Sequence, residues 1–298
     1  MNPLEPYVPD DFDAFWTEAV AEAERAPLDY RRHPQSDVAG ASGSVDLLTF
    51  RSITGDTLHG WFAYPDDGPS PAFLWVPPYS RWSMMPNQYG TRPGMCSLSF
   101  NFFGESAFHQ ETYTPARGYF ADGLFEPETW VFRRMFQDAV IATRVLEAQI
   151  EVDENRVASS GMSQGAGISI WLGAWCQRIK AVAGDMPFLG AMTWVFDQPI
   201  RRYPLKELTD AIEQTPLGRE RALMTLSYFD TMNQATRCAV PTLLTAGLKD
   251  PAVRPEQVRA IFQALAAEKK ELVELDWGHD WHPTMIERNH NWMLRALK

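Results

Sequence analysis

The stretch with the clearest capacity for chemistry is Gly161-Met162-Ser163-Gln164-Gly165, which reads Gly-x-Ser-x-Gly. Residues 156–160 before it have the composition of a short strand, and the apolar residues after it are typical of a buried helix. Between a strand and a helix, this motif forms a tight turn that holds the serine hydroxyl at the top of a sheet. We therefore predict that Ser163 is the nucleophile of an acyl-transfer reaction.

A serine nucleophile needs a base and an acid that orients the base. In the α/β-hydrolase fold these residues follow the nucleophile in the order acid, then histidine. Asp250 follows an apolar strand predicted at 241–246, and His279 follows a strand predicted at 271–277. Both side chains are expected at the sheet edge that carries Ser163. There His279 would take the serine proton, and Asp250 would hold the imidazole in the required tautomer.

Other residues could fill these two roles. Asp276 and Asp280 flank His279, but sequence neighbours of a histidine rarely point at its far nitrogen. Asp230 lies in a region predicted to be helical. His282 is the alternative base, although it is placed to open the last helix. The remaining histidines, which we interpret as surface or packing residues, are His33, His59, His109 and His290.

Backbone N–H groups must stabilise the negative oxygen that forms during acyl transfer. The Gln164 amide lies at the predicted helix N-terminus and supplies one donor. The second comes in this fold from a loop after an earlier strand, which here reads Pro77-Pro78-Tyr79. Proline has no N–H, so the first available amide in this otherwise rigid turn is that of Tyr79. The side chains considered as substrate-binding residues are Arg81, Trp82, Phe188 and Trp277.

Apolar strands and helices alternate along the chain, which predicts an α/β fold with a mostly parallel sheet covered on both faces. Residues 45–52 and 57–64 alternate around a Gly-containing turn and predict a β-hairpin. Residues 186–235 are mostly helical by pattern, so we predict a helical cap inserted into a single domain of residues 1–298. Further strands are predicted at 72–76, 95–100, 156–160 and 181–183, and helices at about 9–26, 130–149, 253–267 and 284–297; no element is assigned at 80–95 or 108–129.

Composition limits the classes of partner. The 298 residues carry a net charge of -11, spread along the chain, which disfavours nucleic acid and anionic membranes. The start has no basic and apolar leader, so we expect no signal peptide. No apolar stretch approaches the length of a membrane span. Cys96, Cys176 and Cys238 have neither zinc nor disulfide spacing, so we expect core thiols in a reducing compartment, the cytoplasm.

Motifs along nearly the whole chain resemble the acetyl xylan esterase and cephalosporin C deacetylase family of carbohydrate esterases. The most specific are the elbow around Ser163 and Thr225-Leu-Ser-Tyr-Phe-Asp230, which matches the cap region of that family. The other similar stretches are Pro9-Asp-Asp-Phe-Asp-Ala-Phe-Trp16, Gly118-Tyr119 through Gly123-Leu124 and on to Arg133-Arg-Met-Phe-Gln-Asp138, Met186-Pro-Phe-Leu189, Gly247-Leu-Lys-Asp250 and Gly278-His279.

The resemblance implies removal of O-acetyl groups from small acetylated sugars, with tolerance of other short acyl esters. It also implies catalysis without a metal or an organic cofactor. Members of the family form ring-like homo-hexamers, trimers of dimers, whose active sites face an internal cavity. We therefore expect a homo-oligomer that acts on small acetylated substrates.

Two stretches depart from the family pattern. Pro77-Pro78-Tyr79 stands where the family has His-Gly-Tyr, and Asn101-Phe-Phe-Gly104 stands where it has Arg-Gly-Gln-Gly. The connection at 80–95 is also short or rearranged. An altered pocket leaves open a hydrolase of other short-chain esters or lactones, and a catalytically silent binding protein on the same scaffold is the alternative from another class.

Overall fold

The computed structural model describes residues 4–35, 38, 40–80, 83–200 and 202–298, and these contain a sheet of nine strands in the order β1-β2-β3-β5-β4-β6-β7-β8-β9. Strands β1, β2, β3 and β5 pair antiparallel, and β5, β4, β6, β7, β8 and β9 pair parallel. The strands are β1 (Tyr30–Gln35), β2 (Ser44–Arg51), β3 (Thr57–Tyr64), β4 (Ser70–Val76), β5 (Cys96–Asn101), β6 (Val152–Met162), β7 (Ile179–Asp185), β8 (Thr242–Gly247) and β9 (Lys270–Leu275).

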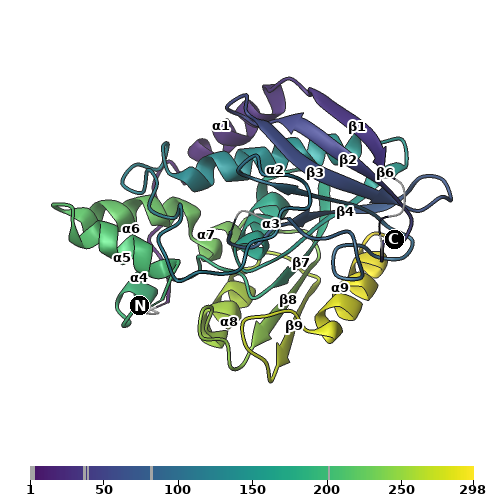
Figure 1. The fold of residues 1–298 in the computed structure, drawn as a ribbon. Coiled ribbons are helices and arrows are strands. Elements are labelled where there is room, and N and C mark those ends of the chain that lie inside the picture. Colours follow the sequence, from purple (N-terminus) through teal and green to yellow (C-terminus); the bar gives the residue numbers. More distant parts are fainter. Residues whose placement is uncertain (1–3, 36–37, 39, 81–82, 201) are drawn as a thin grey trace.

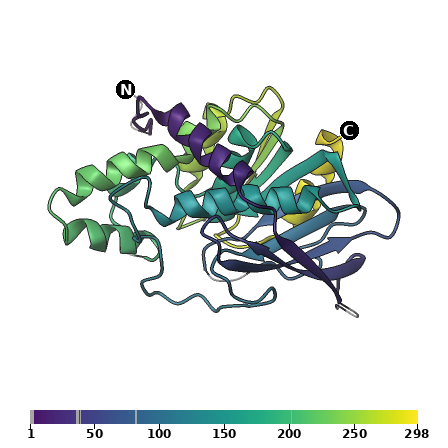
Figure 2. The same cartoon turned by 90° about the horizontal axis from the view of Figure 1, so that it is seen from above.

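Helices cover both faces of the sheet (Figures 1 and 2). Helix α3, which begins directly after Ser163, contacts α1, α2 and α7. Helix α7 also contacts α8, and α9 packs against strands β7 and β8. Aromatic rings fill the space around α3, with Trp16 of α1 at 5.1 Å from Trp171 and 5.3 Å from Phe136. The helices are α1 (Phe12–Arg25), α2 (Val131–Glu147), α3 (Gln164–Trp175), α7 (Thr231–Ala235), α8 (Pro255–Ala264) and α9 (Pro283–Ala296).

Three further helices project beyond one end of the sheet, drawn green in Figure 1. They are α4 (Met192–Phe196), α5 (Leu205–Glu213) and α6 (Gly218–Phe229). The C-terminal end of α6 returns to the core, where Phe229 lies edge-on to Trp16 and Trp130. These helices occupy the region in which the sequence predicts a helical cap.

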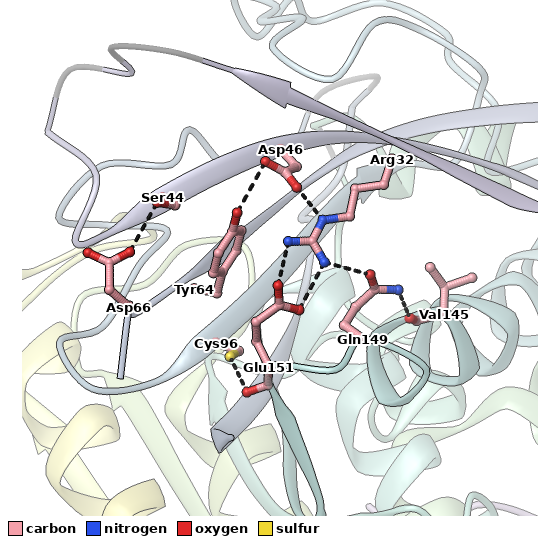
Figure 3. A network of polar contacts seen from close by, with 9 residues as sticks. All are labelled: Arg32, Ser44, Asp46, Tyr64, Asp66, Cys96, Val145, Gln149 and Glu151. Carbon is pink, nitrogen blue, oxygen red and sulfur yellow. Dashed lines mark hydrogen bonds and ion pairs between the residues drawn. The ribbon is translucent and has the colours of Figure 1, made fainter. Parts of the chain in front are cut away.

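A polar network ties the antiparallel edge of the sheet to the start of β6 (Figure 3). Arg32 of β1 donates to both carboxylate oxygens of Glu151, at 2.9 and 2.7 Å, and pairs with Asp46 of β2. Its guanidinium also lies 4.6 Å from the centre of the Tyr64 ring. One arginine therefore joins three segments that are distant in sequence. Strand β1 is mostly exposed and polar, so no apolar alternation predicted it.

The predicted fold class and the predicted hairpin are confirmed, since β2 and β3 pair antiparallel around the turn. Strand β6 begins earlier than its apolar part indicated, because the polar residues of its first half also take an extended form. Residues 83–95 and 102–129, by contrast, contain neither helix nor strand. No helix within the described ranges is long and apolar enough to cross a membrane.

Candidate active site

The turn between β6 and α3 places Ser163 at the C-terminal edge of the sheet. Ser163 has φ of 56° and ψ of -118°, a left-handed backbone conformation that is unusual for a residue with a side chain. The neighbouring segments fix this conformation: the Ser163 amide donates to the carbonyl of Asp185 at 2.8 Å, and its carbonyl accepts from Phe188 at 3.0 Å. The strained turn is thus held at both of its backbone groups.

Close packing explains why residue 165 is glycine. A Cβ atom at Gly165 would lie 2.1 Å from the carbonyl oxygen of Val76, at the end of β4. Helix α3 can therefore approach the sheet only because this position has no side chain. The approach sets the N-terminus of α3, and with it the Gln164 amide, beside the loop that follows β4.

The structure brings Ser163, His279 and Asp250 into one hydrogen-bonded chain. His279 Nδ1 lies 2.6 Å from Asp250 Oδ2, and His279 Nε2 lies 3.0 Å from Ser163 Oγ. A carboxylate only accepts hydrogen bonds, so Nδ1 carries the proton and Nε2 accepts from the serine hydroxyl. The arrangement makes His279 a base for Ser163.

The Asp250 side chain is fully buried and its orientation is fixed. Its Oδ1 accepts from the amides of Ala252 at 2.7 Å and Val253 at 2.9 Å, which leaves Oδ2 for His279. The loops that carry the two residues pack backbone against backbone: a Cβ at Gly247 would lie 2.8 Å from the carbonyl oxygens of Trp277 and Gly278. Both loops follow adjacent parallel strands, which brings them together.

Each of the alternative residues contacts a partner other than Ser163 and His279. Asp276 forms an exposed ion pair with Lys249, and Asp230 caps α7 by accepting from the Met232 amide. His282 caps α9 by accepting from the Thr284 amide at 3.2 Å. Asp280 accepts from the Trp281 amide and lines the cavity in front of Ser163. Of the other histidines, His33 is exposed, His59 is half-buried, His109 contacts Glu111 and His290 contacts the Pro93 carbonyl.

The two predicted oxyanion donors are the amides of Tyr79 and Gln164, and the Gln164 side chain connects the segments that carry them. Gln164 begins α3, whose first amides have no helical acceptor. Its Nε2 donates to the Pro78 carbonyl at 3.4 Å, and its Oε1 accepts from the Tyr119 hydroxyl at 2.9 Å. The Tyr119 hydroxyl also accepts from the Ser80 amide, next to Tyr79. Gln164 and Tyr119 together hold the loop after β4 against the elbow.

Sequence reasoning did not single out Tyr119. Two signals were present: the aromatic residues of the loop at 108–129, and the place of Tyr119 in a stretch that resembles the family's segment before the nucleophile. Burial raises the pKa of the Tyr119 phenol, so the hydroxyl stays protonated and can donate. The ring of Phe103 lies 4.3 Å from that of Tyr119. The apolar stretch Asn101-Phe-Phe-Gly104 therefore reaches the site through an aromatic contact.

A second buried network lies behind the elbow. Arg92 is 1 % exposed and its guanidinium donates to Asn289 Oδ1 of α9 at 3.1 Å, while Asn289 Nδ2 donates to Asp185 Oδ2 at 3.4 Å. Burial lowers the pKa of Arg92 to about 10 and raises that of Asp185 to about 6. The connection at 83–95 is thus anchored to α9 beneath the residue that holds the Ser163 amide.

A cavity of about 380 Å³ opens in front of Ser163 and His279. Phe188 and Tyr79 both line it. Trp277 does not line this cavity, because its indole ring lies against His282 at 4.7 Å. Arg81 and Trp82 lie outside the described residues. The wall residues that the sequence did not indicate include Tyr113, Phe120, Tyr203, Pro204 and Leu205.

The cysteines lie away from this cavity and all three are buried. Burial raises the pKa of Cys96 to about 12 and those of Cys176 and Cys238 to about 11, so they are protonated and unreactive at neutral pH. In the part of the chain that the structure describes, no three His, Cys, Asp or Glu residues are grouped so that they could hold a metal ion.

Comparison with known proteins assigns the family. The model of the family described as Acetyl xylan esterase (AXE1) matches residues 4–295. The chain belongs to the acetyl xylan esterase family. It is 24% identical over 310 residues to the acetyl esterase Axe7A of Xylanibacter ruminicola, a match that covers 99% of this chain and 69% of that protein.

Solved structures agree with this assignment. An acetyl xylan esterase from Paenibacillus sp. R4 superimposes with a TM-score of 0.86 at 25% identity, covering 98% of this chain and 96% of that one. Acetyl xylan esterase 1 from Thermoanaerobacterium sp. JW/SL YS485 superimposes with a TM-score of 0.84 at 24% identity, covering 99% and 96%. The protein is therefore a carboxylic ester hydrolase with the fold of the α/β-hydrolases.

Proposed function

We propose that this acetyl xylan esterase family member is a serine esterase that removes O-acetyl groups from small acetylated sugars through an acyl-enzyme. The observation that carries the proposal is the unbroken chain from Ser163 Oγ through His279 to Asp250, with contacts of 3.0 and 2.6 Å. Few reactions other than acyl transfer require a serine hydroxyl to be polarised in this way.

In the first half of the proposed reaction, Ser163 Oγ attacks the carbonyl carbon of the acetyl group while His279 Nε2 takes the hydroxyl proton. The carbonyl oxygen becomes negative and accepts from the amides of Tyr79 and Gln164. His279 then gives its proton to the sugar oxygen as the ester bond breaks. The sugar leaves as an alcohol, and the acetyl group remains on Ser163.

In the second half, water enters the place of the sugar. His279 takes a proton from this water as its oxygen attacks the acetyl carbon, and the same two amides hold the oxyanion. When the bond to Ser163 Oγ breaks, His279 returns the proton to the serine. Asp250 stabilises the imidazolium in both halves and itself remains ionised.

The size and lining of the cavity favour a small ester. Its volume of about 380 Å³ lies near the lower end of the range of small-molecule sites, about 300–1,000 Å³. Phe120, Phe188 and Met162 line it beside Ser163 and suit an acetyl or another short acyl group. A space of this size suits a small acetylated sugar, the substrate implied by the family resemblance.

Acetate release from acetylated xylose, and p-nitrophenol release from p-nitrophenyl acetate, test the proposal. Ser163→Ala should lose nearly all activity, whereas Ser160→Ala should keep it, because the buried Ser160 hydroxyl contacts no hydrogen-bonding partner among the described residues. A burst of p-nitrophenol equal to the enzyme concentration would support the acyl-enzyme. Equal rates for wild type and Ser163→Ala would end the proposal.

A panel of acyl chain lengths distinguishes this function from hydrolysis of other esters or lactones. We expect acetyl to be preferred, and a preference for long acyl groups would favour the alternative. The homo-hexamer implied by the family resemblance remains a prediction, and light scattering during size-exclusion chromatography measures it directly.

A further inference from the structure

A second cavity of about 180 Å³ adjoins the catalytic one. The two cavities share Arg202, Leu205 and Ala252 in their walls. Ala252 belongs to the loop that holds the Asp250 carboxylate. A substrate bound at Ser163 can therefore extend into this second space, which we call the arginine cavity.

The arginine cavity has two cationic wall residues and, within the described residues, no acidic one. Arg202 and Arg254 both line it, in a protein whose net charge is -11. Many other arginines here have a carboxylate within 4.0 Å, as Arg219 has Asp197 and Arg259 has Glu274. Among the described residues, no carboxylate lies within ion-pair distance of Arg202 or Arg254, and both residues are exposed to solvent. Two guanidinium groups therefore remain available to an anion from outside.

The surroundings of Arg254 are ordered by other contacts. Its guanidinium lies 5.5 Å from the centre of the Trp194 ring, which holds the charged group at the cavity. Gln257 is occupied at both ends of its amide: Oε1 accepts from the Arg254 amide at 3.0 Å and Nε2 donates to the Gly190 carbonyl at 2.7 Å. Charge recognition in the cavity thus falls to the two arginines.

Two carboxylates close to these arginines in sequence, Asp197 and Asp250, are engaged by other groups, and Glu256, two residues after Arg254, is exposed and does not line the cavity. Asp197 accepts from Arg219 at 2.6 Å, and Asp250 faces His279 and the amides of its own loop. Asp197 and Asp250 therefore do not neutralise the two arginines of the cavity.

We propose that the arginine cavity binds an anionic group, a carboxylate or a phosphate, carried by the ester substrate. The inference rests on the proposed function and narrows its substrate class to acetylated sugar acids or sugar phosphates. A guanidinium donates through two parallel N–H groups to such oxygens, and it does so more strongly than to neutral acceptors. The anion would orient the substrate while its acetyl group lies at Ser163.

A matched pair of esters tests the inference: acetylated glucuronic acid and acetylated glucuronamide, which differ only in charge. We expect wild type to favour the acid by about tenfold in kcat/KM at low salt, mainly through KM, as a charge-assisted contact of this kind supplies. Arg254→Gln and Arg202→Gln should each reduce this ratio toward one. Arg259→Gln, in the helix that Arg254 precedes but paired with Glu274, should leave it unchanged.

Binding without turnover provides the second measurement. Calorimetric titration of wild type with glucuronate, glucose 6-phosphate and glucose should show binding of one or both anions tighter than that of glucose, and the stronger anion identifies the source. Arg254→Gln should lose the difference, and higher salt should reduce it.

The outcomes separate this inference from the proposed function. If acetylated glucuronamide is hydrolysed in a Ser163-dependent way but the acid is not preferred, the anion site does not exist and the esterase does. If neither ester is hydrolysed, the assay with p-nitrophenyl acetate decides the esterase proposal, and the titration alone decides the anion site. Equal binding of glucose and both anions would overturn the inference in either case.

Discussion

The edge of the sheet that carries the catalytic residues, here called the catalytic rim, is built differently from the residues that line the cavity in front of Ser163, here called the cavity wall. Ser163, Asp250 and His279 each follow a strand of the parallel part of the sheet, β6, β8 and β9. Much of the cavity wall beyond these residues comes from segments without strands, in the ranges 102–129 and 202–204. The strand ends are fixed by ladder hydrogen bonds, so the rim tolerates little change, whereas the wall is free to differ. The reaction is therefore set by the sheet and the substrate by the loops.

The largest effect on the rim is expected from Asp250→Asn. An amide can no longer stabilise the imidazolium or select the correct tautomer, and kcat for p-nitrophenyl acetate should fall by about a thousandfold or more. Asp276→Asn is the matched control, because Asp276 is exposed and pairs with Lys249. Loss of activity in the control and not in Asp250→Asn would mean that the acid has been assigned wrongly.

Gly165→Ala tests how closely the rim is packed. The new methyl group would lie 2.1 Å from the Val76 carbonyl, which is backbone and cannot move alone. We expect a loss of about 3 kcal/mol or more in the free energy of unfolding. Gly278→Ala adds the same atom where nothing lies within 4 Å. Urea denaturation of both variants checks the comparison, and equal midpoints would show that the elbow has room to relax.

Tyr119→Phe tests a contact between the rim and the wall. It removes the hydroxyl that accepts from the Ser80 amide and donates to Gln164, and so loosens the loop that carries Tyr79. We expect kcat to fall by about tenfold, the equivalent of one or two hydrogen bonds. Tyr228→Phe removes a phenol that donates to Asp11 away from the cavity. If both variants keep full kcat, Tyr119 does not position the oxyanion loop.

The smallest expected effect is a change in the pH dependence of stability in Asp185→Asn. Burial raises the pKa of Asp185 from 3.8 to about 6, so the folded state holds its proton more tightly than the unfolded state. The stability contributed by this proton is present below pH 4 and is lost as the pH rises through about 6. The unfolding free energy of wild type minus that of the variant should fall by about 1–3 kcal/mol between pH 4.5 and 7.5.

Urea denaturation of the two proteins at four pH values measures this difference. A difference that grows with pH would contradict the assignment of Asp185 as a carboxylate destabilised by burial.

The residues of the catalytic rim could be predicted from the sequence, whereas most residues of the cavity wall could not. Strand patterns and chain order located Ser163, Asp250 and His279, because each lies directly after an apolar segment that ends at one edge. Tyr119, Tyr203 and Arg202 gave no such signal, since their positions depend on how irregular segments pack. Strand β1 was missed because Arg32 holds it through charge, without apolar alternation. Trp277 was placed in the pocket by proximity in sequence, whereas its ring turns toward His282.

The most direct test of the central claim is covalent labelling by a fluorophosphonate followed by peptide mapping. The proposed chain of contacts predicts one adduct per protein molecule, on Ser163, and loss of labelling in His279→Gln. His282→Gln should still label, because His282 caps a helix and does not contact the serine. An adduct on another residue, or labelling of Ser163 at the same rate without His279, would contradict the account.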